Sequence, residues 1–381
     1  MPVTTCLPVT ARPHPARQHP ARQLRVPPAW FARPAARDWT CAPAPVEVLG
    51  FHAALPGYAA TPLTELPALA DRLGVGRVLV KDESSRLGLP AFKALGASWA
   101  VHRVLAGRAP GEPVLLVTAT DGNHGRAVAR IAALCGQRAH VFVPRGVSTA
   151  AVAAIAAEGA RVSEVDGSYD EAVRRAGAAA SVDPGAVLVQ DTAWPGYEEI
   201  PSWIVQGYAT LFAELDAQLG AEPPDLVVVP VGVGSLAQAA VTHYRARPGG
   251  RGTALLSVEP DTAACVLASL RRDRPVSVPT GATTMAGLNC GTPSSLAWPY
   301  LRRGLDAATE VTDRASADAV RELAELGVSC GPCGAAALAG ARAALTGPDS
   351  ARRRADLGLG PAATVVLLST EGAADPTRPA T

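Results

Sequence analysis

The stretch VLLVTATDGNHGRAVARIAALCGQRAHVFV, residues 114–143, carries the repeating unit that decides the fold. It opens with a candidate strand at 114–117, passes through a glycine-bearing loop and a candidate helix at 125–135, and ends in a second candidate strand at 140–143. Strands that are apolar at nearly every residue are typical of a parallel sheet covered by helices on both faces. The stretch therefore predicts a strand–helix–strand unit of an α/β protein.

The same alternation continues on both sides of this stretch. Eight such units exceed one compact sheet, so we predict an α/β protein of two lobes, each a parallel-rich sheet covered by helices. We assign residues 113–186 to a small α/β domain, and residues 46–112 together with 187–381 to a large domain. The predicted strands are 78–80, 114–117, 140–143, 161–165, 187–190, 226–230, 255–258 and 364–368, and the predicted helices are 93–106, 125–135, 149–158, 169–180, 203–219, 235–247, 316–326 and 334–345.

The first 45 residues differ in composition from the rest of the chain. They are rich in proline, arginine and alanine, and the pentapeptide HPARQ occurs at 14–18 and again at 19–23. Frequent proline and little apolar periodicity are typical of segments that cannot join a core. We therefore predict that residues 1–45 form a disordered tail; a start codon assigned too far upstream would give the same pattern.

Length, charge and cysteine content narrow the class of protein. The chain has 381 residues and a formal net charge of +1 at pH 7, which argues against a nucleic-acid or membrane-surface partner. No apolar run approaches the roughly 18 residues of a membrane span, and the N-terminus has no continuous apolar leader. Seven scattered cysteines, an odd number, suit a reducing compartment. We therefore expect a cytoplasmic protein with no nucleic-acid or membrane partner.

Lysine is rare in this chain and marks the first candidate site. Lys81 and Lys93 are the two lysines, so 33 of the 35 basic residues are arginine. Arginine stays protonated in proteins, whereas lysine can lose its proton and attack a carbonyl as a neutral amine. Lys93 opens the helix predicted at 93–106, where the helix dipole disfavours a cation. This position is explained if the amine is an imine or lies near a cofactor phosphate; the alternative is an ordinary exposed lysine.

The loop TDGNHG, residues 120–125, lies directly between a predicted strand and a predicted helix. Its glycines allow backbone N–H groups to approach an anion. Asp121 is placed to act as an acid or base, and Asn123 to donate a hydrogen bond to an oxygen. His124 is either catalytic or a capping or packing residue.

The loop VGVGS, residues 231–235, predicts a phosphate site. It also joins a strand to a helix, and its two glycines and the helix N-terminal Ser235 form an anion cradle. A dinucleotide-binding protein is an alternative, with Glu259 at the end of the next strand contacting a ribose. The third glycine of that motif is missing, because alanine and glutamine occupy its place.

Further candidates follow other predicted strands. Asp191 lies where a strand ends, which favours a ligand-binding carboxylate, although a turn or helix N-cap is the alternative. Ser369 and Thr370 follow the last strand, where a hydroxyl would meet a ring nitrogen. Cys330 and Cys333 form a C-x-x-C pair without a thioredoxin-sized unit around it, so we favour a small-residue turn near a ligand over a redox site.

Taken together, these segments resemble one family. From about residue 51 to residue 372 the chain is similar to pyridoxal-phosphate-dependent enzymes of the tryptophan-synthase-β type, fold type II, and among them to diaminopropionate ammonia-lyases. The run QDTAW at 190–194, followed by GYEEIP at 196–201 and QGY at 206–208, is the most discriminating, because general threonine and serine dehydratases lack it. The other stretches that carry the resemblance are FHAALPGYAATPLTELPALA, KDESSRLGLPAFKALG, TATDGNHGRAVA, PVGVGSLA, SVEP and MAGLNCGTPS.

The resemblance implies a fold, a cofactor and a set of roles. It implies a two-lobed, generally homodimeric enzyme that binds pyridoxal 5'-phosphate and a small amino-acid substrate; we expect no metal. Lys93 would hold the cofactor covalently as a Schiff base. Asp121 and Asp191 would take the α-proton from the D- and the L-substrate, respectively. In addition, Asn123 would contact the cofactor's 3'-oxygen, Gly232, Val233, Gly234 and Ser235 would bind its phosphate, and Ser369 or Thr370 would bond to its ring nitrogen.

The implied reaction is the α,β-elimination of 2,3-diaminopropionate to pyruvate and two ammonia. Two departures from the family pattern keep an alternative open, a serine or threonine dehydratase or a β-replacement enzyme acting on another β-substituted alanine. CGPCG at 330–334 stands where the family reads SGESG, so that Pro332 replaces a carboxylate, and EGAAD at 371–375 stands where it reads EGDTD. Cys265 and Cys290 fall where the family has a cysteine pair able to form a disulfide, and we expect reduced thiols here.

Overall fold

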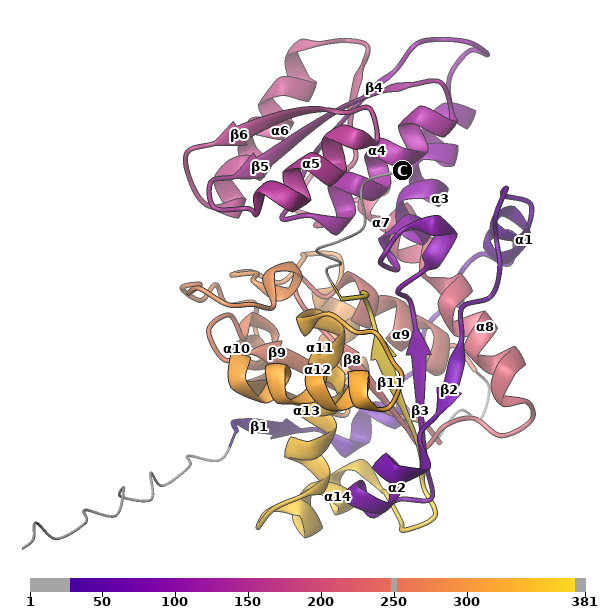
Figure 1. Cartoon of the computed structure of the whole chain (residues 1–381), viewed down its shortest axis with the longest axis vertical. Helices are drawn as coiled ribbons and strands as arrows, with labels where there is room; N and C mark the ends of the chain where they lie inside the picture. The colour runs from indigo at the N-terminus through magenta and orange to yellow at the C-terminus, as the bar shows by residue number, and fades with distance from the viewer. Residues whose placement is uncertain (1–27, 248–251, 374–381) are drawn as a thin grey trace, which may run out of the picture.

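The computed structural model describes residues 28–247 and 252–373, and within them the chain forms two sheets, one in each lobe (Figure 1). The lower sheet has the strand order β1 (Trp30–Ala32), β10 (Ala307–Val311), β9 (Ala254–Pro260), β8 (Leu226–Pro230), β11 (Thr364–Ser369), β3 (Arg77–Asp82) and β2 (Leu63–Glu65). The upper sheet has the order β6 (Arg161–Val165), β5 (Arg138–Pro144), β4 (Leu115–Ala119) and β7 (Ala186–Leu188).

Both sheets are rich in parallel pairs. Every pair in the upper sheet is parallel, and in the lower sheet β1 and β2, the two edge strands, are the antiparallel members. Parallel strands require crossovers, which the helices between them provide. The predicted parallel-rich α/β fold is therefore confirmed.

Helices cover both faces of the lower sheet (Figure 1). On one face α13 lies across the four strands β8 to β11 and packs against α12, α14 and α2; on the other face α9 packs against β8 and β9, with α11, α8 and α7 around it. The bounds are α1 (Glu47–Ala53), α2 (Pro67–Leu73), α7 (Glu199–Gly207), α8 (Ala209–Leu219), α9 (Ser235–Arg245), α10 (Cys265–Arg272), α11 (Trp298–Gly304), α12 (Asp313–Glu325), α13 (Pro332–Leu345) and α14 (Ser350–Leu357), with short 3-10 helices η1 (Pro34–Asp38), η2 (Arg86–Gly88) and η3 (Ala286–Leu288).

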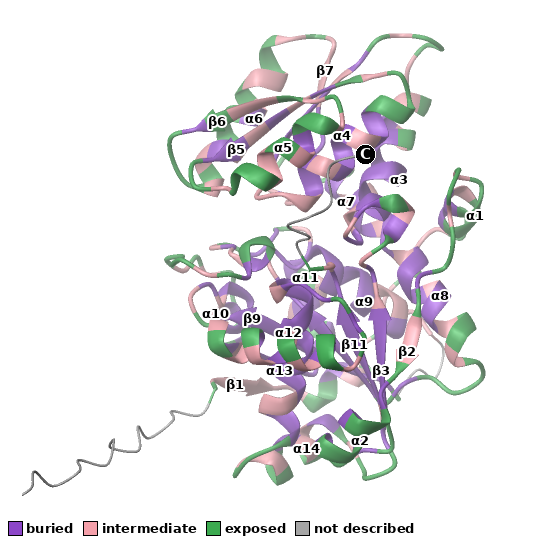
Figure 2. Ribbon diagram, viewed as in Figure 1, coloured by how far each residue is buried: buried purple, intermediate pink, exposed green. Residues whose placement is uncertain are grey.

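The upper sheet is covered in the same way by α3 (Lys93–Ala106), α4 (Asn123–Leu134), α5 (Thr149–Ala157) and α6 (Tyr169–Val182). α6 contacts all four strands, whereas α4 packs against β4 and β5 and carries α3 and α5 beside it. Figure 2 shows the buried residues concentrated on the strands and on the inner faces of these helices. Complete burial of each valine or leucine in such strands stabilises the fold by about 1.5–3 kcal/mol.

The predicted elements coincide with observed ones, with one division and several omissions. The helix predicted at 203–219 is two helices, α7 and α8, which meet at Tyr208. Among the omitted elements, β10 is buried although its sequence, AATEV, lacks the apolar run that marks a strand. Its neighbours in the sheet, not its own composition, place it there.

The prediction of a disordered tail up to residue 45 is wrong for its last part. Within residues 28–45 the chain forms β1 and η1, and β1 pairs with β10 at the edge of the lower sheet. Trp30 Nε1 also donates to Asp356 Oδ2 at 2.9 Å. Tertiary pairing thus outweighs a composition rich in proline and arginine. Residues 1–27 lie outside the described residues.

Two contacts bear on the predicted domain boundaries. The predicted boundary at 186/187 falls within β7, which pairs with β4 in the upper sheet. The helix α3, assigned by the sequence to the large domain, packs against both α4 and α7. Among the helices of the described residues, none is both long and apolar enough to cross a membrane.

Candidate active site

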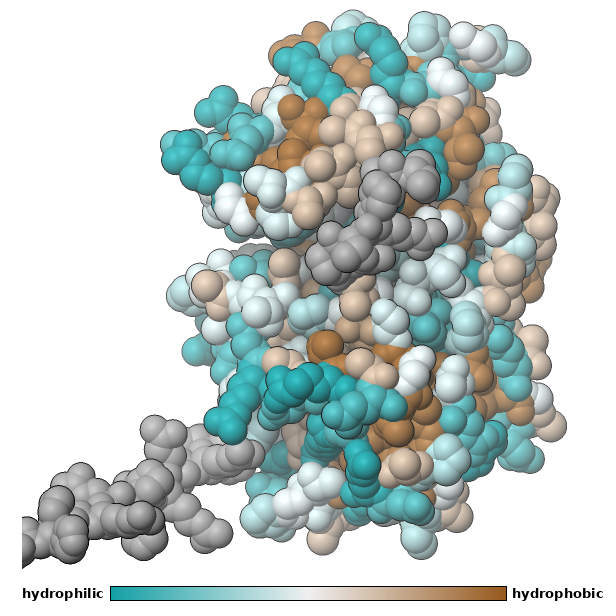
Figure 3. Space-filling model, in the orientation of Figure 1, coloured by the Kyte–Doolittle hydropathy of each residue, from teal (hydrophilic) through white to brown (hydrophobic). Residues whose placement is uncertain are grey.

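A cavity of about 410 Å³ lies between the two lobes, where the carboxyl ends of several strands meet. Figure 3 shows the surface of the molecule indented at the junction of the lobes. Loops that follow β4, β8 and β11 all border the cavity, as expected for ligand sites in parallel α/β sheets. Of the predicted site residues, those that line it are Lys93, Asp121, Asn123, Asp191, Gly232, Val233, Gly234, Ser235 and Thr370.

Lys93 is the first residue of α3 and faces Asp191. Its Nζ donates to Asp191 Oδ2 at 2.5 Å. Burial acts against the ammonium, but the Asp191 carboxylate outweighs it and raises the pKa of Lys93 above its ordinary value. Burial likewise opposes the charged form of Asp191, and the Lys93 ammonium holds the pKa of that carboxyl well below its usual range. Asp191 is thus the ionic partner of Lys93, and each group stabilises the charged form of the other.

The second oxygen of Asp191 is held by two residues that the sequence prediction omits. Tyr169 Oη donates to Asp191 Oδ1 at 3.5 Å, and Gln190 Nε2 lies 3.3 Å from the same oxygen. Gln190 Nε2 also donates to Tyr169 Oη at 2.8 Å. Gln190 could have been found from its place in the QDTAW run, whereas Tyr169 begins α6, four residues after β6 ends, and no motif marks it.

Asp121 has the opposite electrostatic character to Asp191. Burial raises the pKa of Asp121 to about 7, the negative charges of Asp191 and Asp170 add to the rise, and the Lys93 ammonium opposes it. A carboxyl group with a pKa near neutrality can accept and return a proton at physiological pH. Two carboxyl groups with opposite pKa shifts therefore line one cavity.

Asn123 and Glu371 join the two lobes across the cavity. Asn123, the first residue of α4, donates from Nδ2 to Glu371 Oε2 at 2.6 Å. Glu371 follows β11, and its Oε1 accepts from the Cys333 N–H at 3.1 Å. A carboxylate only accepts, so the amide nitrogen of Asn123 must face Glu371, and its second hydrogen remains for a ligand. The sequence prediction omits Glu371, although its place directly after the two hydroxyls at a strand end is a usable signal.

The loop between β8 and α9 has the backbone of an anion cradle. Gly234 has a φ of 102°, in the left-handed region that favours glycine. A Cβ on Gly232 would lie 3.0 Å from Cys290 Sγ. Ser235 Oγ donates to the Asp191 carbonyl oxygen at 2.7 Å and so ties this loop to Asp191. The first N–H groups of α9 have no partner within the helix and can bind a phosphate.

Of the two hydroxyls predicted near a ring nitrogen, Thr370 borders the cavity. Ser369 is buried behind it, and its Oγ donates to Cys330 Sγ at 3.0 Å. Cys333 lines the cavity beside Pro332 at the start of α13, and both thiols of this pair are free. Instead of the predicted small-residue turn, Cys330 and Gly331 directly precede α13, and Pro332 and Cys333 are its first two residues.

His124 is buried beside the same carboxylate. Its Nε2 lies 2.8 Å from the Val189 carbonyl oxygen, and its Nδ1 lies 3.9 Å from Asp191 Oδ2. The side chain therefore neither caps a helix nor lies apart from the site. Its second ring nitrogen has no hydrogen-bond partner among the described residues.

The structure also bears on the interpretations of Glu259, of Lys81 and of the Cys265–Cys290 pair. Glu259, offered for a ribose in the dinucleotide alternative, is buried and accepts from the N–H groups of Val266 and Leu267, both at 2.7 Å, so that alternative is wrong for this residue. Lys81 is buried in a cluster of charged groups, where its Nζ donates to Glu214 Oε2 at 2.8 Å. Cys265 and Cys290 are free buried thiols.

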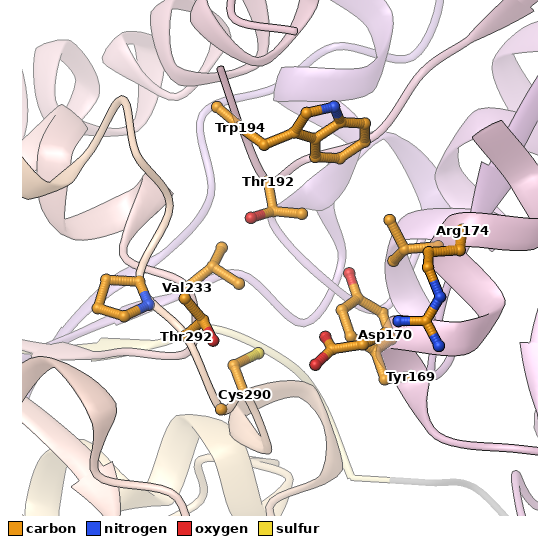
Figure 4. A pocket seen from close by; sticks show the side chains of 12 residues that line it. Tyr169, Asp170, Arg174, Thr192, Trp194, Val233, Cys290 and Thr292 are labelled. Carbon is orange, nitrogen blue, oxygen red and sulfur yellow. The ribbon is translucent and has the colours of Figure 1, made fainter. Parts of the chain in front are cut away.

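A second cavity of about 270 Å³ adjoins the first. It shares Tyr169, Val233 and Cys290 with the larger cavity. Figure 4 shows that Asp170 and Arg174, both from α6, lie across it from Cys290. The larger cavity is therefore bordered on the Tyr169 side by a second, smaller one.

Comparison with known proteins gives the same family as the sequence motifs. A family model described as pyridoxal-phosphate dependent enzyme matches residues 54–371. The diaminopropionate ammonia-lyase of Salmonella typhimurium is 41% identical over 301 residues, covering 72% of this chain and 74% of its own. The enzyme of that name from Escherichia coli K12 is 36% identical over 348 residues, covering 85% of this chain and 87% of its own.

Solved structures agree with these relatives. The crystal structure of Escherichia coli diaminopropionate ammonia-lyase in complex with D-serine superposes with a TM-score of 0.83 at 33% identity, covering 91% of this chain and 94% of that one. The same enzyme in complex with an aminoacrylate–pyridoxal-phosphate azomethine intermediate gives 0.80. Maize serine racemase, at 24% identity and a TM-score of 0.72, shares the fold. The chain therefore belongs to the pyridoxal-phosphate-dependent enzymes of fold type II and, within that family, to the diaminopropionate ammonia-lyases.

Proposed function

We propose that this chain catalyses the α,β-elimination of 2,3-diaminopropionate, which consumes one water and releases pyruvate and two ammonia. The observation that carries the proposal is the contact between the Lys93 amine and the Asp191 carboxylate in a cavity that Asp121 also lines. A nucleophilic amine and two carboxyl groups with opposite pKa shifts suit the removal of an α-proton and a β-amine. The relatives named diaminopropionate ammonia-lyase support this substrate.

Pyridoxal 5'-phosphate is the cofactor, and the residues of the cavity fit it. Lys93 offers an amine for its aldehyde. The turn before α9 offers N–H groups for its phosphate, and Gly232 lets this turn pack close to Cys290, since a Cβ there would lie 3.0 Å from its Sγ. Asn123 retains one amide hydrogen for the 3'-oxygen, and the hydroxyl of Thr370, with Ser369 behind it, is available to the ring nitrogen. When bound, the cofactor accepts the electrons that remain when Cα loses its proton.

Acidic and basic side chains of this chain then transfer the protons of the reaction. We assign Asp121 to accept the α-proton of the D-enantiomer and Asp191 that of the L-enantiomer. Ammonia leaves Cβ only when the amine carries a proton, so an acid must lie nearby. Lys93, hydrogen-bonded to Asp191 at 2.5 Å, or one of the aspartates fills that role. Burial of the cavity strengthens these electrostatic effects by excluding water.

A dehydratase or β-replacement activity on another β-substituted alanine is the second candidate. Pro332 lines the cavity where the family pattern has a carboxylate, which removes one group able to hold a substrate ammonium. Against this candidate, Glu371 still places a carboxylate 3.1 Å from the Cys333 N–H, next to Pro332. The observed geometry therefore favours the diamino acid.

Three further assignments belong to this proposal. We propose that the enzyme acts as a homodimer in the cytoplasm, in line with the near-neutral charge and the odd number of cysteines. We also propose that the four-stranded and seven-stranded sheets are the centres of a small and a large domain, with the cavity between them. Sedimentation of the purified chain tests the first assignment.

A substrate panel tests the proposed reaction. The purified holoenzyme would be supplied separately with D- and L-2,3-diaminopropionate, serine, threonine and an O-activated serine, and pyruvate (2-oxobutyrate from threonine) and ammonia would be measured. We expect two ammonia per pyruvate from the diamino acid and slower turnover of the hydroxy amino acids. Faster turnover of serine or its activated ester, with one ammonia per pyruvate, would establish the second candidate instead. Lys93→Ala is the inactive control.

A further inference from the structure

One ring nitrogen of His124 is hydrogen-bonded to the backbone, and the other has no hydrogen-bond partner among the described residues. Its Nε2 lies 2.8 Å from the Val189 carbonyl oxygen, and because a carbonyl only accepts, Nε2 must carry the hydrogen of the neutral ring. Nδ1 then carries no hydrogen and can only accept a hydrogen bond. It is buried and has no hydrogen-bond partner among the described residues. An unpartnered buried acceptor is uncommon in folded proteins and calls for an explanation.

The bare nitrogen lies next to the Asp191 carboxylate. Nδ1 is 3.9 Å from Asp191 Oδ2, the same oxygen that accepts from Lys93 Nζ at 2.5 Å. Two acceptors therefore face each other without a hydrogen between them, and one added proton would join them as a charge-assisted pair. While the Lys93 ammonium is present, a second cation beside it is disfavoured.

The proposed function removes that ammonium. Once the Lys93 nitrogen is covalently engaged with the cofactor, it no longer provides an ammonium to Asp191, which is 6% exposed. A buried carboxylate that loses its partner either acquires another or takes up a proton. A protonated Asp191 could not accept a proton from a substrate.

We propose that His124 is a positioning residue, which binds a proton at Nδ1 when the Lys93 amine is withdrawn and thereby keeps Asp191 ionised. This inference rests on the proposed function, because it needs Lys93 to be the cofactor-binding amine. The proton comes from solvent: one N–H bond forms at Nδ1, and the resulting imidazolium replaces the ammonium as the partner of Oδ2. Both ring nitrogens then donate, Nε2 to Val189 and Nδ1 to Asp191.

The surrounding charges are consistent with this exchange. Burial lowers the pKa of His124, the Asp191 carboxylate raises it, and the Lys93 ammonium lowers it. Tyr169, from α6, contacts the other oxygen of Asp191, Oδ1, and stays neutral because burial raises its pKa well above the ordinary value. The further titratable groups that line this cavity are Asp121, in the loop before α4, and Cys290, Cys333 and Glu371. Removal of the Lys93 charge therefore takes away the one cation that opposes protonation of His124 among these groups.

The test reads the histidine itself and needs no substrate. The full-length chain, labelled with 15N in its histidine rings, would be titrated by NMR before and after saturation with pyridoxal 5'-phosphate. The His124 signals are identified by their absence in His124→Gln, whose amide keeps a donor for the Val189 oxygen. We expect the midpoint of the His124 titration to rise by about one to three pH units on loading. His52, buried at hydrogen-bond distance from Thr210, is the control and should not shift.

Two variants separate this inference from the proposed function. Lys93→Gln removes the ammonium without any cofactor, and it should raise the His124 midpoint as loading does. Adding Asp191→Asn to it should abolish the rise. The inference is overturned if His124 titrates alike in all states, or if 13C signals show that Asp191 takes the proton instead. Failure of lyase activity with an intact shift would count against the proposed function alone. A thermal midpoint within a few degrees of wild type confirms that each variant is folded.

Discussion

Lys93 Nζ and Asp191 Oδ2 lie 2.5 Å apart, although 98 residues separate them in the chain. Lys93 begins α3, and Asp191 lies three residues beyond β7, which the parallel pairing places beside β4. The contact makes Asp191 the ionic partner and hydrogen-bond acceptor of Lys93. In this contact the Lys93 side chain acts as a cation, whereas the proposed reaction needs it as a neutral nucleophile.

Lys93→Arg should keep the fold and abolish activity. Arginine preserves a cation for Asp191, but it cannot supply the neutral amine that bonds an aldehyde. We expect kcat/KM to fall by a factor of about 10³ or more. Borohydride reduction followed by peptide mass mapping should label residue 93 in the wild type and leave this variant unlabelled. Lys81, the other lysine, serves as the internal control and should carry no label, because its Nζ is buried against Glu214.

Substitution of each of the two aspartates should affect the reaction of one substrate enantiomer more than that of the other. Asp121→Asn should lower kcat/KM for D-2,3-diaminopropionate by about 10²- to 10⁴-fold, because it removes the base on one side of the substrate. Asp191→Asn should do the same for the L-enantiomer. Initial rates with each pure enantiomer check both variants. Equal losses for both enantiomers in either variant would contradict the assignment of one base to each.

The pH dependence should report the state of Asp121. Its pKa is about 7, and it acts as a base only when ionised, that is, above that pH. The kcat/KM for the D-enantiomer should therefore rise with pH through about 7, since this ratio reports the free enzyme. Asp191 has a strongly lowered pKa, so the L-enantiomer should show no corresponding rise from that residue. Identical profiles for the two enantiomers would speak against this account.

Gly234→Ala should weaken both the fold and cofactor binding. The residue has a φ of 102°, and an added Cβ would lie 2.6 Å from Leu301 Cδ1. A left-handed conformation alone costs a residue other than glycine about 1–2 kcal/mol. Urea unfolding of the cofactor-free chain measures the loss of stability, and a fluorescence titration with pyridoxal 5'-phosphate measures affinity. Gly360→Ala, where a Cβ would contact nothing within 4 Å, should change neither quantity.

Glu214→Gln should be strongly destabilising, because it breaks a buried ionic cluster. Glu214 accepts from Lys81 Nζ at 2.8 Å and from Arg86 Nη1 at 2.6 Å. Removing one partner of a buried pair leaves an uncompensated charge and costs about 3–5 kcal/mol. Denaturant unfolding should show this loss, whereas Glu65→Gln, which removes the exposed partner of Arg77, should cost about 0–1 kcal/mol.

The same carboxylate predicts acid sensitivity. Although burial raises the pKa of Glu214, its bonds to Arg86 and Lys81 outweigh burial and lower that pKa from 4.5 to about 2. A depressed folded-state pKa adds stability that is fully present above the unfolded value of about 4.5 and is lost as pH falls through about 2. The wild type should therefore lose stability between these pH values more steeply than Glu214→Gln. Parallel acid titrations of the two would contradict this.

Local sequence was sufficient for the elements whose signals lie within one short segment. The apolar runs at β4 and β8 and the glycine loop at 231–235 were identified in this way, because a parallel strand buried on both faces needs an apolar run and an anion cradle needs glycine. Short edge strands such as β1 were missed. Their pairing energy comes from a distant partner, β10, and not from their own composition.

Likewise, only some residues of the candidate site could be predicted from the sequence. Lys93, Asp121 and Asn123 stand in recognisable motifs at the ends of strands or starts of helices, so their types and positions pointed to them. Tyr169 also begins a helix but stands in no recognisable motif, and its relevance depends on α6 bringing it within 3.5 Å of Asp191. Glu371 is intermediate: the sequence placed it at a strand end, but its bond to Asn123 exists only because the two lobes meet.

The sequence by itself determined the α/β class and the family, and it singled out Lys93 as the candidate cofactor-binding amine, because periodicity, residue scarcity and short motifs are properties of neighbouring residues. Tertiary structure alone decided which titratable groups lie close enough to influence one another's protonation. The spacing between Lys93, His124 and Asp191 is set by the packing of α3 and α4 beside the upper sheet, and electrostatic coupling depends on distances in space and on burial, not on separation along the chain.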